Sequence, residues 1–153
     1  MQLLEPTLTF AFEARVEIAE SLRIGRGPGE EVWFTPITGG TVSGPRLSGV
    51  VLPYGGDWST TRPTGTTLDA RYLLRADDGA VIEIHNRGVF QSSKEVETRL
   101  VKGDPVAESE YYYRTSPVFQ TDAESHSWLT SRVFVGMARD EAGVVCIRFF
   151  VLD

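Results

Sequence analysis

The chain has 153 residues, of which 41% are hydrophobic and 24% are charged. This length suits one domain over residues 1–153, and this composition excludes disordered chains and fibrous repeats. The 15 lysine and arginine residues stand against 21 aspartates and glutamates, which gives a net charge of −6. That acidic balance argues against nucleic acid or an anionic membrane as a partner.

The single cysteine and the distribution of apolar residues exclude further classes of protein. Cys146 alone forms no internal disulfide and no cysteine-based zinc site. No apolar run reaches the roughly 20 residues that a membrane-spanning helix needs. The first residues lack the basic stretch and apolar core of a signal peptide. We therefore expect a soluble, cytoplasmic protein.

Alternation of apolar and polar residues is the dominant pattern along the chain. From Leu8 to Ile18 every second residue is apolar, which is typical of a half-buried strand. Further strands are predicted in segments rich in Val, Ile, Phe, Tyr and Thr, at residues 31–36, 41–52, 68–76, 81–90, 111–119, 132–139 and 144–152.

Glycine and proline separate these strands at residues 25–29, 39–40, 54–57, 62–65 and 102–105. Asp77-Asp78-Gly79 indicates a hairpin, and residues 140–143 indicate a second one. Short antiparallel links predict an all-β fold, a single eight-stranded antiparallel up-and-down barrel. Helix is expected to be minimal and confined to residues 92–102 and 123–131.

The last hairpin, residues 132–152, breaks the amphipathic rule. Both faces of its second strand are apolar, apart from Arg148. The outer face of a barrel normally meets water, so this pattern predicts that the outside of the hairpin is covered. We therefore expect a homodimer through the 132–152 hairpin, and a long loop or the 92–102 segment folded over it is the alternative.

Motifs for nucleotide binding, zinc proteases and serine hydrolases are absent. His85 alternates with charged residues and is expected to face solvent, and His126 lies in a predicted loop. No cluster of carboxylates has the spacing of a metal site, so neither a metal nor another cofactor is expected.

Three polar residues fall on strand faces that should be buried: Arg46, Tyr72 and Asn86. A buried arginine or asparagine without hydrogen bonds costs several kcal/mol. We interpret the three as the polar end of an apolar ligand cavity. The alternative is a structural polar network that ties the ends of the barrel together.

The predicted loop Gly55-Gly56-Asp57-Trp58 presents a carboxylate and an indole. Asp57 is the candidate general base if burial raises its pKa, and a loop-capping role is the alternative. We expect Asp57 and Trp58 at the mouth of a cavity lined by Arg46 and Asn86. Trp58 then stacks on a ligand or plugs the barrel end.

In the run Tyr111-Tyr112-Tyr113-Arg114, alternate residues face opposite sides of a strand, and the parity leaves open which pair faces inward. Tyrosine hydroxyls and an arginine suit a carboxylate, an enolate or a phenol. Trp128 is expected to cap the barrel. The candidate ligand-binding residues are Arg46, Asp57, Trp58, Tyr72, Asn86, Tyr113, Arg114 and Trp128.

An ordered set of short motifs over nearly the whole chain resembles the domain-of-unknown-function 3237 family, also called uncharacterised protein family 0311. The matching stretches include Gly44-Pro45-Arg46-Leu47-Ser48-Gly49, Gly55-Gly56-Asp57-Trp58, Leu68-Asp69-Ala70-Arg71-Tyr72, Asn86-Arg87-Gly88, Tyr113-Arg114-Thr115-Ser116-Pro117 and Trp128-Leu129-Thr130. The resemblance implies a closed antiparallel barrel similar to lipocalins and allene oxide cyclase-like proteins. It carries over no reaction. Thr64 stands where the pattern has an acidic residue. Arg71 belongs to the recurrent positions, but its parity sets it opposite Tyr72.

Three functions fit the sequence. The first is a barrel that binds a small, partly apolar, anionic or phenolic molecule. The second is a cofactor-free lyase, isomerase or cyclase that uses Asp57, and the third is a structural or interaction protein with a filled barrel. A cavity above about 300 Å³ lined by Arg46 and Asn86 favours the first two, and without it the filled barrel is favoured. A raised pKa of Asp57 beside hydrogen-bond donors favours chemistry.

Overall fold

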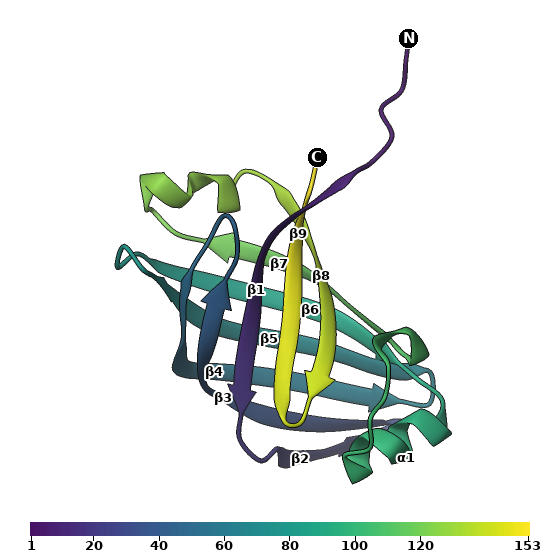
Figure 1. Cartoon of the computed structure of the whole chain (residues 1–153). Helices are drawn as coiled ribbons and strands as arrows, with labels where there is room; N and C mark the ends of the chain where they lie inside the picture. Colours follow the sequence, from purple (N-terminus) through teal and green to yellow (C-terminus); the bar gives the residue numbers. More distant parts are fainter.

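The computed structural model describes residues 1–153 and consists almost entirely of antiparallel strands (Figure 1). In chain order the elements are β1 (Leu8–Ile18), β2 (Leu22–Gly27), β3 (Glu30–Ser43), β4 (Gly49–Arg62), β5 (Gly65–Ala76), β6 (Val81–Gln91), α1 (Lys94–Lys102), the 3-10 turn η1 (Glu108–Glu110), β7 (Tyr112–Gln120), the 3-10 turn η2 (Glu124–Leu129), β8 (Val133–Glu141) and β9 (Val144–Leu152). The strands are hydrogen-bonded in the order β1-β9-β8-β7-β6-β5-β4-β3-β2, and a pairing of β1 with β3 closes the sheet. Eight strands therefore form a closed barrel, which confirms the predicted fold, and β2 is a ninth strand attached to β3.

The prediction of a turn at Gly39-Gly40 is wrong, because β3 runs through this dipeptide as one strand. The first half of β3 pairs with β2 and the second half pairs with β1, so the strand bends where it changes partner. Gly39 and Gly40 have φ angles of 151° and 141° at this bend. A Cβ on Gly40 would lie 1.9 Å from the carbonyl oxygen of Arg15. Glycine here marks a corner of the barrel, a position where two backbones approach closely.

The predicted loop at residues 55–58 is also strand, since β4 extends from Gly49 to Arg62. A shift in register between Val51 and Gly55 makes a bulge against β5. Gly55 has a φ of 96°, and a Cβ on Gly56 would lie 2.2 Å from the Phe34 ring. The two glycines therefore serve a bulge and a close packing contact, and they do not form a turn.

The two ends of the barrel differ in what fills them. One end holds η2 and both chain termini (Figure 1). Between the strands at this end the rings of Phe12, Phe119, Phe134 and Phe149 pack together, with centroids 4.9 to 5.9 Å apart. Trp128 from η2 lies against this cluster, 5.7 Å from the Phe134 ring. The other end, where the hairpins β4–β5 and β8–β9 turn, carries smaller and more polar inward side chains.

The outside of the last hairpin is covered over one half only. Arg15, Arg139, Glu13 and Glu141 form ion pairs there, with Arg15 to Glu141 at 2.9 Å and Arg139 to Glu141 at 2.7 Å. Glu108 of η1 pairs with Arg148 at 2.8 Å, so the loop before β7 lies on this half.

In β9 the fully buried Phe149 faces the core, and Phe150 faces outward. None of the helices is long and apolar enough to cross a membrane.

Candidate functional site

The hollow end of the barrel contains a cavity of about 260 Å³. All eight strands of the barrel contribute to it. Its polar lining consists of Thr35, Asp57, Ser59, Thr66, Tyr72, Asn86, Tyr113, Thr115 and Asp140. Its apolar lining consists of Val16, Ile18, Ile37, Leu68, Ala70, Phe90, Val145 and Ile147. An apolar cavity of about 150 Å³ holds benzene, so this volume suits one ring with a few substituents.

Asp57 on β4 is the acidic centre of the cavity. Its Oδ1 accepts a hydrogen bond of 2.9 Å from the backbone N–H of Asp69 on β5. Burial raises the pKa of the Asp57 carboxyl to about 6, against the effect of that hydrogen bond, and the nearby Asp69 carboxylate adds to the rise. A carboxyl with this pKa exchanges protons near neutral pH.

Asp57, Ala70 and Asn86 lie in one row across β4, β5 and β6. The small Ala70 leaves space between the carboxylate and the amide, and Tyr72 is two residues further along β5. The Tyr72 hydroxyl and the Asn86 Oδ1 are both buried and have no hydrogen-bond partner. Buried polar atoms of this kind are costly in a folded protein unless something binds them.

Both tyrosines of the cavity stay neutral at physiological pH. Burial raises the pKa of Tyr72, the Asp57 charge adds to the rise, and the neighbouring Asn86 amide opposes it. Burial also raises the pKa of Tyr113, again with help from the Asp57 charge. Tyr113 packs edge to face on Phe90, with ring centroids 5.4 Å apart. Two neutral hydroxyls therefore lie within electrostatic range of one carboxyl.

The charge of the lining favours some ligands over others. Asp57 and Asp140 are its ionisable carboxyls, and no lysine, arginine or histidine lines the cavity. An anion would lose its hydration here without gaining a cationic partner. Nowhere in the structure do three His, Cys, Asp or Glu side chains gather as metal ligands.

The prediction that Arg46 lines the cavity with Asn86 is wrong. The predicted strand 41–52 is interrupted, and Arg46 lies in the turn between β3 and β4, at the filled end. Its backbone N–H donates to the carbonyl of Ala11 at 3.1 Å. Its guanidinium carbon lies 4.0 Å above the centre of the Trp128 ring. Trp128 caps the barrel as predicted, but on the side opposite to the cavity.

Two more residues of the predicted set lie on the outside of the barrel. Trp58 follows the inward Asp57, so it faces outward, where it is 47% exposed and lies 4.7 Å from the Phe34 ring. Arg114 follows the inward Tyr113 and lies over the Tyr112 ring. Arg71 also faces outward and pairs with Glu83 at 3.0 Å. Of the eight predicted residues, the cavity therefore brings together Asp57, Tyr72, Asn86 and Tyr113.

Both histidines lie outside the cavity. His85 contacts Asp69 on the outer face of the barrel, the orientation that its alternation predicts. His126 of η2 contacts Asp78 at 2.8 Å, between η2 and the β5–β6 turn. Neither ring reaches the cavity.

Several cavity residues escaped the sequence analysis. Thr35, Ser59, Thr66 and Asp140 line the cavity without having been singled out. Ser59 is two residues from Asp57 on β4, and Thr66 lies on the same face of β5 as Leu68, Ala70 and Tyr72. Period two identifies Ser59 once residues 55–62 are strand, and it identifies Thr66 once the predicted strand 68–76 begins at Gly65. Asp140, at the end of β8, carries no comparable signal.

A family profile and related sequences match most of the chain. The profile of a family described as "Protein of unknown function (DUF3237)" matches residues 6–152. A UPF0311 protein of Rhodopseudomonas palustris is 36% identical over 146 residues, which cover 94% of each chain. A UPF0311 protein of Clostridium acetobutylicum is 38% identical over 119 residues, which cover 77% of this chain and 75% of that one.

Solved structures agree with the barrel. The Rhodopseudomonas palustris protein superposes with a TM-score of 0.93 at 32% identity, over 99% of this chain and 100% of that one. A "beta-barrel like protein" of Acinetobacter baumannii gives 0.84 at 29% identity, over 99% of both chains. A Penicillium herquei protein described as an enzyme gives 0.75 at 19% identity, over 100% of this chain and 98% of that one, a likeness of fold alone. The chain belongs to the DUF3237 family, whose curated relatives are named UPF0311 proteins.

Proposed function

We propose that the barrel binds a small, uncharged, partly apolar molecule with a hydroxyl or an enolisable carbonyl, and that Asp57 transfers a proton on it. The reaction class is a cofactor-free isomerisation, elimination or cyclisation. One observation carries this proposal: a partly buried carboxyl with a pKa of about 6 lies in a largely apolar cavity beside two neutral tyrosines.

The proposed chemistry follows from the protonation states of Asp57 and the two tyrosines. A general base works best when its pKa is near the working pH, and Asp57 meets this condition. When Asp57 removes a proton from a carbon or hydroxyl, negative charge develops on the substrate oxygen. The neutral hydroxyls of Tyr72 and Tyr113 are the donors available to stabilise that charge in a site of low polarity. Asp57 then returns the proton to the product, so no other reactant is needed.

The residues that line the cavity favour an uncharged ligand over the anionic one that the sequence also allowed. A phenolic or enolic molecule is compatible with the cavity, whereas an anionic molecule lacks a cation to pair with. The cavity of about 260 Å³ is slightly smaller than the bound of about 300 Å³ set for common ligand pockets. This cavity is below that bound and is not lined by Arg46, so the criterion drawn from the sequence is not met. What supports a binding role over a filled barrel is the pair of buried polar atoms without partners, the Tyr72 hydroxyl and the Asn86 Oδ1, and the volume limits the ligand to about one ring. The fold of the Penicillium herquei enzyme is compatible with catalysis in this architecture.

Binding without chemistry is the second candidate, because the Tyr72 hydroxyl and the Asn86 Oδ1 lack partners inside the protein. An experiment on Asp57 separates the two. Acetophenone serves as the probe, since exchange of its α-protons for deuterium reports enolisation and is followed by proton NMR. Its binding is measured separately by calorimetry.

The wild type is expected to accelerate exchange over buffer, and Asp57→Asn is expected to abolish the acceleration while binding persists. Asp77→Asn, on the exposed β5–β6 turn, is the matched control and should behave like the wild type. Binding with no acceleration in the wild type would leave the barrel as a binding protein. Absence of both for acetophenone and for single-ring phenols would contradict the proposal.

A further inference from the structure

An N-terminal arm, residues 1–6, projects from the barrel past the C-terminus (Figure 1). Two of its leucines are open to water, with Leu3 74% and Leu4 95% exposed. The arm makes no side-chain hydrogen bond and no ion pair with the rest of the chain, and the fold leaves its two leucines exposed.

The outer surface beside the arm carries an apolar patch of six residues on β1, β9 and β8. Leu8, Leu152 and Val133 are cross-strand neighbours in one row. Phe10, Phe150 and Val135 form the next row. Val133 is 64% exposed and Leu8 is 52% exposed. The outer apolar patch is thus the uncovered half of the last hairpin, extended onto β1.

The arm is directed away from the patch of its own chain. Asp153 donates its backbone N–H to the Thr7 carbonyl at 2.9 Å, and its carboxylate accepts from the hydroxyls of Thr7 and Thr9. Pro6 restricts the backbone just before this anchor. The arm therefore continues outward beyond β1, and Leu3 and Leu4 lie exposed, away from the rows that begin at Leu8 (Figure 1).

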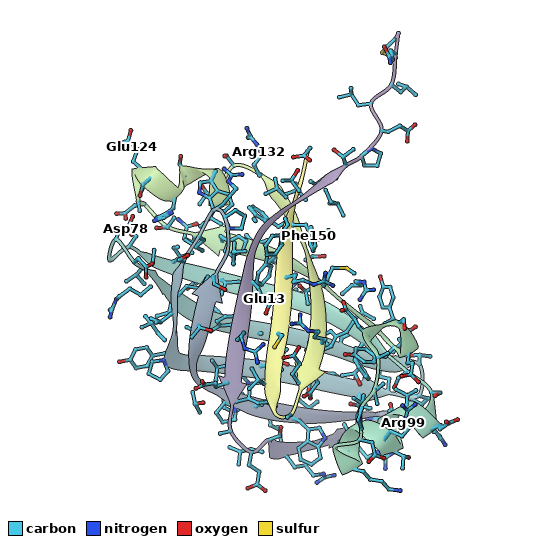
Figure 2. The ribbon with its side chains drawn as sticks, in the orientation of Figure 1. Glu13, Asp78, Arg99, Glu124, Arg132 and Phe150 are labelled. Atoms are coloured by element: carbon cyan, nitrogen blue, oxygen red, sulfur yellow. The ribbon has the colours of Figure 1, made fainter.

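Opposite charges lie on the arm and on the edge of the patch. Glu5 has no ion-pair partner in the chain. Arg132 immediately precedes Val133; its guanidinium donates one hydrogen bond, to the carbonyl of Ser131, and has no ion-pair partner. Figure 2 shows Arg132 and Phe150 toward the end of the barrel from which the arm leaves.

We infer that a second copy of this chain covers the outer apolar patch in a twofold dimer, with each arm lying across the patch of the other copy. A twofold axis makes the exchange reciprocal, so both patches and both arms are buried at once. Six extended residues span roughly 20 Å, more than the width of three strands at about 4.8 Å each. Leu3 and Leu4 then cover the two rows, and Glu5 approaches the partner's Arg132. This inference is independent of the proposed function.

The association state tests the inference. Sedimentation equilibrium at micromolar concentrations should show a dimer for the wild type and a monomer for Leu3→Asp/Leu4→Asp. These two positions lie outside the folded barrel, so circular dichroism should show a folded monomer whose thermal stability does not depend on protein concentration. Phe150→Asp should also give a monomer. Val50→Glu, at an exposed valine of β4 outside the patch, is the control and should remain a dimer.

A charge reversal tests the contact between arm and patch. Glu5→Arg and Arg132→Glu should each weaken association about two- to fivefold, and the double variant should restore it. A wild-type monomer would overturn the inference. A dimer that survives Leu3→Asp/Leu4→Asp would overturn it as well, because the arm would then lie outside the interface.

Discussion

The Asp57 carboxylate accepts the backbone N–H of Asp69 at 2.9 Å, and this is its one hydrogen bond within the protein. The bond orients the carboxylate along the wall between β4 and β5. It does not compensate for burial, because the pKa of Asp57 still rises to about 6. The protein therefore holds an acidic group in a state that costs stability when the group is ionised.

Asp57→Asn should stabilise the protein at neutral pH. Because the pKa of Asp57 is higher in the folded state than its ordinary value of 3.8, the folded protein binds the proton more tightly. Its contribution to stability is fully present below about pH 4 and is lost as the pH rises through about 6. Asparagine resembles the neutral acid, so the variant should gain about 2–3 kcal/mol over the wild type above this range.

Urea unfolding across the pH range measures this difference. The two proteins should have similar free energies of unfolding at the acidic end and diverge as the pH rises. Parallel profiles would show that the Asp57 carboxyl is not perturbed.

The pH dependence of the acetophenone exchange should follow the same group. As a base, Asp57 acts only when it is ionised, so the second-order rate constant should rise with pH and level off above about 6. Asp77→Asn should keep this profile. A rate that falls through the same range would instead assign Asp57 as the acid.

Tyr72→Phe should separate binding from stability. The Tyr72 hydroxyl is buried without a partner, so its removal should leave the free energy of unfolding unchanged or raise it by up to about 1–3 kcal/mol. The same change should weaken binding of acetophenone, because the hydroxyl is a donor in the cavity. Tyr54→Phe, at a tyrosine that is 62% exposed, is the control for thermal melting and calorimetry. A loss of stability with unchanged binding would make Tyr72 a structural residue.

The sequence predicts the inward side chains well where a strand is regular. Period two placed Tyr72 and Asn86 inside, because β5 and β6 pair without any shift in register. The parity of β7 stayed open, since only the closed barrel decides that Tyr113 faces inward. Asp57 was expected at a cavity for a reason that does not hold, because it lies on a strand and not in a loop.

Two Gly-Gly dipeptides account for most of the errors in the predicted strands and turns. Gly-Gly is typical of turns, and the same freedom serves a strand corner or a bulge. The pattern therefore predicts a break at Gly39-Gly40, and it extends the predicted strand 41–52 through the actual turn at residues 44–48, which places Arg46 inward. Because the turn is predicted at the wrong place, the sequence predicts Arg46 in the cavity, whereas it lies at the filled end.

Arg46→Met should leave the cavity unaffected. Arg46 stacks on Trp128 at the filled end, so the variant should lose about 0.5–1 kcal/mol of stability, as for an exposed cation–π contact. Binding of acetophenone and the pH profile of exchange should equal those of the wild type. Calorimetry and thermal melting check both, and lost binding would mean that the filled end communicates with the cavity.

Gly40→Ala should prevent proper closure of the barrel. The new Cβ would lie 1.9 Å from the Arg15 carbonyl oxygen, where β3 begins to pair with β1, and the φ of 141° is unfavourable for any L side chain. Neither backbone can move away without breaking the hydrogen bonds between β3 and β1, so we expect the free energy of unfolding to fall by about 3 kcal/mol or more.

Gly29→Ala is the matched control. Gly29 also has a positive φ, of 76°, but nothing lies near its Cβ position, so this variant should show only backbone strain of about 1–2 kcal/mol. Chemical denaturation of the two variants separates the cost of backbone strain from the cost of the clash with β1. Equal losses of unfolding free energy would show that the clash with β1 plays no part.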